Sequence, residues 1–521
     1  MSARTPLSLE AELKDRSTHI MPSHLDSQRG LGFTIFLFVA ASWLAFLIFF
    51  GRAPATDEVF FKCTGLSWLL GGPWAAKEET GFFGPAIQPG IEEIFFTYPP
   101  GYPLGFGLFA KLFGFSWRTC VAYDAVIHLA LVFTLGIFFG KLDGNVKKWR
   151  WWIATGLIFA GAAGRPDELA MLFGYAGLAA ASSSQTSTRN LWISNLLLAC
   201  CSVVSVPCIM VLGTIRAGWI LFSRMPASRK ALQTSTLLLC GAAAWAATAL
   251  WATGEHPGAL TQNIAVTFGL VSSPGADSVQ QLLIYYPTSV AATALLALLG
   301  VWQLIRSRGI EEFLSWCQFW VAPLLVWAFF FTRYPHQGYY YWFWTPWLIA
   351  AANRGFANPR RASQFLPAGI ASTACMLCSI SVIALLAVKN VRYLLITASL
   401  PKTQHWTAQS ALVRSLIPPG SRVLAWAHWW SIGDQCQVYD NLVAEQIDPE
   451  NLDYMVLTAH GTGTPGLHQP LPEKLQAAIN RGDFKMVHST IDDAPSRMMG
   501  IPLSNSAWGA GCIIYKAIPK Q

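Results

Sequence analysis

Long apolar runs recur along most of this chain and constrain its fold more than any other feature. The runs are about 15 to 22 residues long, enough for a helix to cross a hydrocarbon layer roughly 30 Å thick. They fill much of residues 31–395, and 53% of the 521 residues are hydrophobic while 12% are charged. The mean hydropathy of +0.39 agrees with this pattern. The sequence therefore predicts a polytopic α-helical membrane protein.

The basic residues set the predicted topology. Most Lys and Arg lie in short loops beside apolar runs, where an excess of positive charge marks the cytoplasmic side. We therefore expect about eleven spans in the plasma (inner) membrane, a cytoplasmic segment 1–30 and an extracytoplasmic carboxyl terminus. These loops also account for the net charge of +8, so we expect membrane lipids and no nucleic acid as partners.

The first predicted span, 33–50, is a retained signal anchor, because no cleavable signal peptide precedes it. A charged tip, Arg165-Pro166-Asp167-Glu168, separates two short apolar runs, and its proline ends the first of them. The other apolar runs are 122–139, 151–164, 169–181, 191–206, 232–253, 282–305, 313–331, 340–352 and 365–388. Between 206 and the basic residues Arg224, Arg229 and Lys230 the chain crosses back once more, which gives about eleven spans.

The first outer loop, residues 51–118, concentrates polar chemistry. It opens with Asp57-Glu58 directly after the first span and closes on Tyr98-Pro-Pro-Gly-Tyr102-Pro. The glycine-rich run 104–115 is too short for a span, so we expect a helix at the membrane interface or dipping partway in. Asp57-Glu58, the 165–168 tip and the segment Arg333-Tyr-Pro-His336 all lie at helix ends on one face. Together they would build a polar pocket for a substrate with an anionic headgroup and a lipid tail.

Residues 396–521 change character and predict a small extracytoplasmic α/β domain. Short apolar runs alternate with polar stretches at 422–426, 437–440, 454–458, 484–489 and 512–517, with a helical pattern at 473–480. Cys436 and Cys512 would both lie in an oxidising space. A disulfide between them and two separate buried thiols are the open alternatives.

These motifs resemble the GT-C class of polyprenyl-phosphate-sugar-dependent glycosyltransferases. The likeness is greatest to the branch with the protein O-mannosyltransferases and the lipid A aminoarabinose transferase. It rests on the acidic pair after the first span, the Tyr-Pro-Pro-Gly-Tyr-Pro element, Arg165-Pro166-Asp167, the Arg333/His336 loop and the outer carboxyl-terminal domain. The resemblance implies sugar transfer from a polyprenyl-phosphate donor to a glycan, lipid or protein acceptor, with inversion at the anomeric carbon.

The resemblance also implies roles for particular residues. The acceptor hydroxyl must lose a proton as it attacks, so a carboxylate acts as general base. We assign this role to Asp57, with Glu58 and Asp167 as further catalytic candidates. Arg333 is the first candidate for the donor phosphate, because a guanidinium binds it bidentately. Weaker candidates for the phosphate are His336, Arg165, Arg52 and Lys62, and the candidates for sugar or acceptor contacts are Tyr98, Tyr102 and Tyr339.

Simpler interpretations stand beside these roles. Asp57-Glu58 would also suit a solvated helix start, and Arg165 with Asp167 would also suit a local ion pair that caps a hairpin. His336 fits a surface histidine, and the aromatic cluster 339–347 fits an interface belt first and a sugar platform second. No His or Asp cluster has metal-ligand spacing, so we expect no required metal. A divalent cation, as in some members of the wider class, stays open.

Two other functions compete with the glycosyltransferase. An O-antigen ligase or polymerase also handles polyprenyl-linked sugars, but its main outer loop comes late in the chain. A lipid-linked-sugar transporter or flippase would favour charges at mid-membrane and internal repeats. In this sequence the charges cluster mainly at helix ends.

Overall fold

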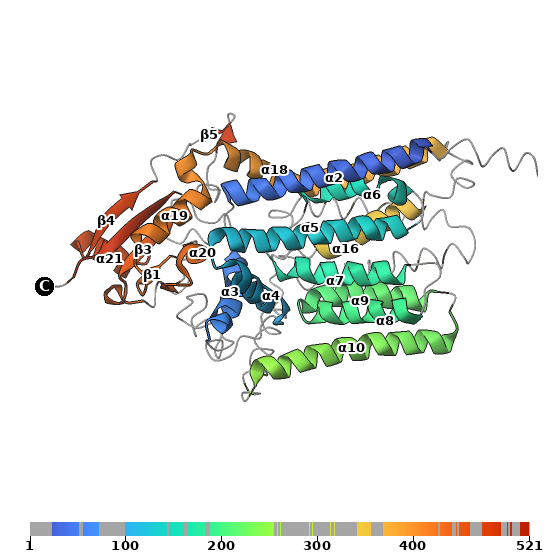
Figure 1. Ribbon diagram of the computed structural model, residues 1–521, viewed down its shortest axis with the longest axis horizontal. Helices are drawn as coiled ribbons and strands as arrows, with labels where there is room; N and C mark the ends of the chain where they lie inside the picture. Colours follow the sequence, from blue (N-terminus) through green and yellow to red (C-terminus); the bar gives the residue numbers. More distant parts are fainter. Residues whose placement is uncertain are drawn as a thin grey trace, which may run out of the picture.

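The computed structural model of the chain describes a helical bundle with a mixed β-sheet at one of its ends (Figure 1). It describes residues 23–51, 56–71, 99–142, 145–160, 165–182, 188–223, 225–254, 341–355, 368–425, 428–439, 447–458, 471–490, 497–498, 501–502 and 511–519, together with a few single residues. For some of these the backbone alone is described.

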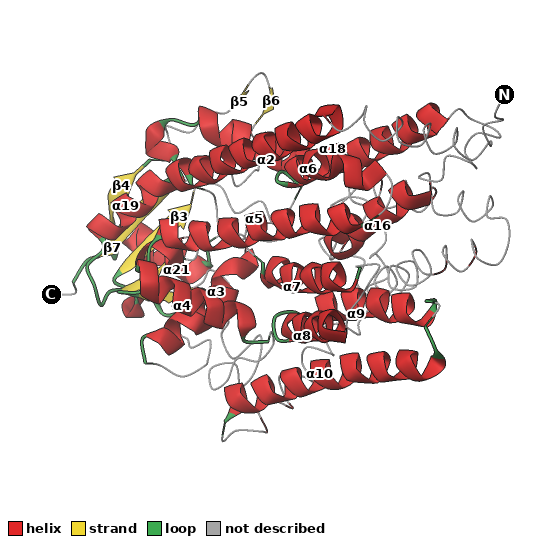
Figure 2. Ribbon diagram, turned by 45° about the vertical axis from the view of Figure 1, so that its right-hand side comes forward, coloured by secondary structure: helices red, strands yellow, loops and turns green. Residues whose placement is uncertain are grey.

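The bundle is built from long helices that run roughly along one direction (Figures 1 and 2). Their starts carry ordinary capping signals: Ser116 accepts the Thr119 N–H, Ser205 accepts the Cys208 N–H, and Pro166 occupies the first turn of its helix. The helices are α2 (Ser23–Phe50), α5 (Trp117–Lys141), α6 (Asn145–Leu157), α7 (Pro166–Ala181), α8 (Thr188–Ser202), α9 (Val206–Leu221), α10 (Ala227–Thr253), α16 (Tyr341–Gly355) and α18 (Ala368–Ser399).

Three helical segments in the described part of the chain are long and apolar enough to cross a membrane: Gly30–Phe50, Trp117–Lys141 and Ala227–Thr253. A fourth candidate is the pair Ser379–Val388 and Asn390–Ser399, which is bent by 45° within α18. The two predicted spans at 282–305 and 313–331 fall almost wholly outside the described residues. The predicted total of about eleven spans therefore stays a prediction.

Two predicted boundaries are wrong in ways that matter for function. Helix α5 begins at Trp117, ahead of the predicted start at residue 122, because Ser116 provides the N-cap. This places Asp124 in the second turn of the helix. Helix α18 continues to Ser399, past the predicted end at residue 388, so it leads directly into the carboxyl-terminal part.

Four aromatic residues of α16 are buried, so these positions do not form the predicted interface belt. Trp342, Phe343, Trp344 and Trp347 are each at most 6% exposed. The hydroxyl of Tyr175 on α7 donates to the Phe343 carbonyl at 2.8 Å and accepts the Trp347 N–H at 3.2 Å. A tyrosine thus bridges a helical turn that contains Pro346. The cluster contributes to the core of the bundle.

The first outer loop contains two helices that cross very closely, α3 (Thr56–Leu69) and α4 (Gly101–Phe113). A Cβ at Gly65 would overlap the carbonyl oxygen of Pro103, and a Cβ at Gly107 would lie 2.7 Å from the Gly65 carbonyl oxygen. The backbones can approach because both crossing positions lack a side chain. The predicted helix at 104–115 is confirmed as α4, although its depth in a membrane stays a prediction.

The carboxyl-terminal part forms a five-stranded sheet of order β2-β1-β3-β7-β4. Strand β1 pairs in parallel with β2 and β3, whereas β7 is antiparallel to β3 and β4. The strands lie where the sequence predicted them: β1 (Arg422–Leu424), β2 (Gln437–Tyr439), β3 (Tyr454–Thr458), β4 (Phe484–Ser489) and β7 (Cys512–Ala517). Helix α21 (Glu473–Arg481) packs on a small core of Leu424, Met455 and Phe484. A short hairpin pairs β5 (Arg497–Met498) with β6 (Ile501–Pro502).

Two further helices join the sheet to the bundle, α19 (Trp406–Leu416) and the single turn α20 (Trp429–Ile432). Of the two alternatives left open for Cys436 and Cys512, the structure shows two separate buried thiols. Cys436 Sγ contacts the carbonyl oxygen of Pro418, and Cys512 Sγ lies 3.0 Å from Gln409 Oε1 of α19. The second contact ties β7, which lies between β3 and β4, to α19.

Candidate functional site

Helix α3 carries the acidic pair in its first turn and a lysine one turn later. Glu58 and Lys62 are four residues apart and both are fully buried, so they lie on the same side of the helix. Asp57 belongs to the same first turn, and its side chain lies outside what the structure describes. The acidic residues at this helix start also agree with the favourable helix dipole.

Lys62 forms a buried ion pair with Asp124 on α5. The Lys62 Nζ to Asp124 Oδ2 distance is 2.5 Å, and the two side chains are at most 1% exposed. The Tyr102 hydroxyl on α4 donates to the other oxygen, Oδ1, at 2.5 Å, while the Tyr123 hydroxyl donates to the Tyr102 carbonyl at 3.1 Å. Charges so far from water need a partner. The network therefore fastens α3, α4 and α5 to one another.

The network keeps Tyr102 protonated. Burial first, and then the neighbouring Asp124 carboxylate, raise the pKa of Tyr102 well above its usual value, and Glu58 adds to the effect. The residue is 1% exposed. The predicted role of Tyr102 as a sugar contact would require this packing to open.

A second polar group forms at the start of α7. Arg165 Nε donates to Asp167 Oδ2 at 3.1 Å, and the Ser205 hydroxyl, at the cap of α9, donates to Oδ1 at 2.8 Å. The Arg165 guanidinium lies over the Phe61 ring of α3, 5.5 Å from its centroid. Phe61 in turn meets Tyr102 edge to face. The first outer loop and the 165–168 tip thus converge on one site, as the sequence predicted for these two features.

Two residues of the region were missed as site candidates, Asp124 and His128, both on α5. His128 Nδ1 lies 2.9 Å from Glu168 Oε1, and Nε2 lies 3.0 Å from the Ile158 carbonyl oxygen. The signal was present in the sequence, since an aspartate and a histidine four residues apart inside an apolar run are unusual. Their spacing places them on one face of α5.

The remaining predicted site residues fall outside the described part of the chain: Arg52, Tyr98, Arg333, His336 and Tyr339. Their predicted roles therefore stay predictions. Among the described residues, no group of three or more His, Cys, Asp or Glu side chains is placed to hold a metal ion.

The described arrangement can hold anions and fix carboxylates. Arg165 is partly accessible, with 11% of its side chain exposed, and a guanidinium is suited to bidentate binding of carboxylates and phosphates. Asp124 and Asp167 each accept hydrogen bonds through both oxygens. These two carboxylates hold neighbouring groups in place. The acidic pair at the start of α3 supplies the other carboxylates near the site.

Comparison with known proteins shows which solved fold this chain resembles. No family model and no curated protein sequence matches the chain. Among solved structures, the fold is similar to the crystal structure of ArnT from Cupriavidus metallidurans bound to undecaprenyl phosphate, with a TM-score of 0.54 and 12% sequence identity. The match covers 94% of this chain and 99% of ArnT. The chain therefore shares the fold of ArnT, as the resemblance stated in the sequence analysis led us to expect.

Proposed function

We propose that the protein is an integral membrane glycosyltransferase that moves a sugar from a polyprenyl-phosphate donor to an acceptor hydroxyl at the outer face of the membrane. One observation carries the proposal: the ArnT-like fold extends over nearly the whole of both chains. ArnT was crystallised with undecaprenyl phosphate, a compound of the same class as the leaving group of this reaction. The cations and carboxylates gathered around α3 suit such a donor.

Transfer would proceed as a single displacement with inversion. The acceptor oxygen forms a bond to the anomeric carbon while the bond from that carbon to the phosphate oxygen breaks. The phosphate leaves with the electron pair, and the acceptor proton passes to a carboxylate. We assign that carboxylate to Asp57 in the first turn of α3, with Glu58 beside it. Asp167 serves the reaction by holding Arg165 in place.

We assign the donor phosphate to arginine side chains. Arg165 approaches the site from α7 and lies against Phe61 of α3, and Arg333 and Arg52 remain further candidates from the sequence. A guanidinium stays charged and binds phosphate through two donors. Lys62 is fully buried and already paired with Asp124, which suits it less for this role.

The decisive experiment is transfer from radiolabelled polyprenyl-phosphate sugars to membrane acceptors by purified wild type, Asp57→Asn and the control Asp448→Asn. Asp448 lies in the carboxyl-terminal part, and its exposed carboxylate pairs with Lys474. We expect transfer to fall at least a hundredfold in Asp57→Asn, the usual size of a general-base contribution, while donor binding and Asp448→Asn activity persist. Full activity of Asp57→Asn would refute its assignment as base. A wild type that transfers from no donor would refute the function.

The proposed topology has its own test. Alkaline phosphatase fused after residue 399 or 519 should be active, because the enzyme requires an extracytoplasmic location. The same reporter fused after residue 223, in the basic loop before α10, should be inactive. The opposite pattern would invert the proposed orientation.

A further inference from the structure

A tryptophan from the carboxyl-terminal part covers the buried lysine of the site. The Nζ atom of Lys62 lies 4.3 Å from the ring centroid of Trp430 and 5.7 Å from that of Phe106. The same Nζ atom forms an ion pair with Asp124 Oδ2 at 2.5 Å. Lys62 and Trp430 are both fully buried. The ammonium therefore lies between a carboxylate and an indole face, an arrangement that stabilises a desolvated cation.

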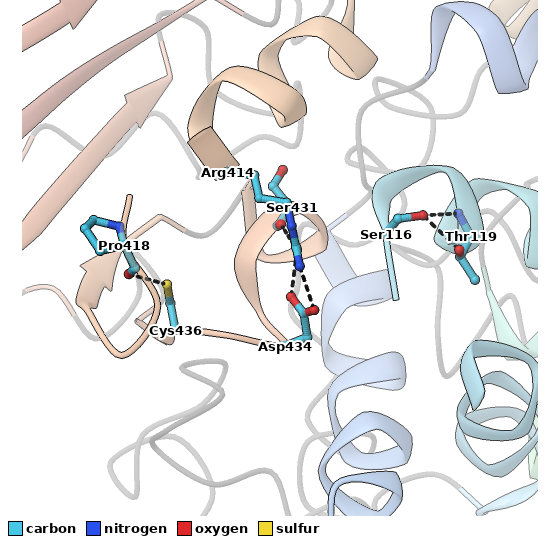
Figure 3. A network of polar contacts seen from close by, with 7 residues as sticks. All are labelled: Ser116, Thr119, Arg414, Pro418, Ser431, Asp434 and Cys436. Atoms are coloured by element: carbon cyan, nitrogen blue, oxygen red, sulfur yellow. Dashed lines mark hydrogen bonds and ion pairs between the residues drawn. The ribbon is translucent and has the colours of Figure 1, made fainter. Parts of the chain in front are cut away.

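Helix α20 holds Trp430 in this position. Arg414 of α19 donates to the Ser431 carbonyl oxygen at 2.7 Å and makes a bidentate ion pair with Asp434 at 2.8 and 2.9 Å (Figure 3). These contacts form a clamp at the carboxyl-terminal end of α20, which is a single turn. The interaction with Asp434 raises the pKa of Arg414, so the clamp stays charged.

Helix α5 supports Trp430 from the membrane side. The Trp430 ring meets Trp117 at 5.0 Å between centroids, and Trp117 stacks on Trp406 at 5.1 Å with 9° between the planes. Trp117 is the first residue of α5. It directly follows Ser116, which caps the helix through its contact with Thr119 (Figure 3). Trp430 is thus fixed by two elements before it contacts Lys62.

The consequence concerns the acidic pair. Lys62 lies on α3 one turn after Glu58 and Asp57, so whatever holds Lys62 also sets the position of the first turn of that helix. A ligand phosphate can reach Lys62 only if Trp430 or Asp124 moves away. The observed enclosure therefore fits a residue that positions α3 better than a residue that receives the donor.

We propose that Trp430 is a positioning residue for the transfer reaction: through its contact with Lys62, the carboxyl-terminal part fixes α3 and so places the catalytic acidic pair. This inference rests on the proposed function for its consequence in catalysis. The contact between Trp430 and Lys62 can be tested even if the proposed function is wrong.

Trp429 offers a matched control, since it belongs to the same helical turn and is equally buried but packs on Phe115, at 5.2 Å between centroids. Trp430→Leu and Trp429→Leu remove the same volume from the same interface. Trp430→Phe keeps an aromatic face. Lys62→Met removes the cation from the partner side while keeping a long apolar side chain.

The experiment is a double-mutant cycle with two readouts. Kinetics of transfer are measured for wild type, Trp430→Leu, Lys62→Met and the double variant, and amide hydrogen exchange is followed in peptides covering residues 56–69. We expect Trp430→Leu to lower kcat about tenfold, the equivalent of one desolvated cation–π interaction, with little change in donor KM. The same loss should be absent in the Lys62→Met background, and Trp430→Phe should recover part of it. Exchange in α3 should rise in Trp430→Leu and not in Trp429→Leu.

Each contrary result has a separate meaning. Additive effects of Trp430→Leu and Lys62→Met would overturn the inference, and so would an equal rise in α3 exchange in the two tryptophan variants. A large rise in donor KM for Lys62→Met with kcat unchanged would assign Lys62 to the donor phosphate instead. If the wild type transfers no sugar, the proposed function fails, while the exchange data still decide whether Trp430 holds α3 through Lys62.

Discussion

His128 on α5 and Glu168 on α7 are joined by a contact of 2.9 Å between Nδ1 and Oε1, with both side chains enclosed. The other ring nitrogen faces the Ile158 carbonyl oxygen at 3.0 Å. Both ring nitrogens face oxygen atoms, and a neutral imidazole has only one N–H to donate. The pair must therefore carry one further proton, either on the imidazole or on the carboxyl group of Glu168. The pair thereby fastens α5, the end of α6 and α7 around the site.

Removing one member of this pair should destabilise the bundle. We expect Glu168→Leu or His128→Leu to lower the free energy of unfolding by about 3 kcal/mol or more, because the remaining group is left buried without its partner. The double variant should lose less than the sum of the two single variants. Thermal unfolding of the purified proteins in one detergent ranks the stability of the wild type, the two single variants and the double variant. Strictly additive losses would contradict a coupled pair.

The close crossing of α3 and α4 predicts sensitivity at one glycine. Gly65→Ala should cost roughly 1–3 kcal/mol of stability and most of the transfer activity, because the new Cβ forces the two backbones apart. Gly241→Ala on α10 is the control, since nothing lies within 4 Å of a Cβ there. Thermal unfolding and transfer assays measure the effects. Equal behaviour of the two variants would contradict the tight crossing.

Arg165 should matter for donor affinity. We expect Arg165→Lys to weaken binding of polyprenyl phosphate about tenfold, because lysine keeps the charge but loses the bidentate geometry. Arg189→Lys at the exposed start of α8 makes the same exchange away from the site. Binding is measured by titration of the purified proteins with polyprenyl phosphate. Unchanged affinity in Arg165→Lys would remove this residue from the phosphate site.

His428, the N-cap residue of α20, predicts a pH dependence of stability. Burial lowers the pKa of His428 to about 4, whereas the unfolded chain has a value near 6.5. Between these values the unfolded state binds more protons, so stability is present above about pH 6.5 and is lost as the pH falls toward 4, by roughly 3 kcal/mol in total. His428→Phe should keep the aromatic contacts with Trp406 and Trp117 and remove this part of the loss. The measurement is the unfolding temperature of both proteins at pH 7.5 and pH 5. A variant that loses as much stability as the wild type would contradict the role of His428.

The predictable features of this protein were those encoded locally. Apolar runs located many of the helices, and alternation located the five strands of the sheet, because both patterns are read from neighbouring residues. The family resemblance added the fold. Placing helix ends on one face predicted that the first outer loop meets the 165–168 tip, and Arg165 does lie over Phe61 of α3.

The contacts that build the site were not predictable in this way. Lys62 and Asp124 lie 62 positions apart and belong to different helices, α3 and α5. Trp430, which lies over the Lys62 ammonium, is much farther along the chain. A partner in space leaves no periodic pattern in a single sequence. The residues that pair across elements therefore had to come from the structure.

The position of β7 has a consequence for how the protein is made. Strand β7 follows every other strand in the chain, yet it lies inside the sheet between β3 and β4, and Cys512 links it to α19. Helix α19 holds α20, and α20 carries Trp430 onto Lys62. Helix α3 emerges early from the ribosome, but its final support arrives only after residues 512–517 have been synthesised. A nascent chain halted a few codons before that strand would leave β3 and β4 without the partner that joins them, and α3 without this support.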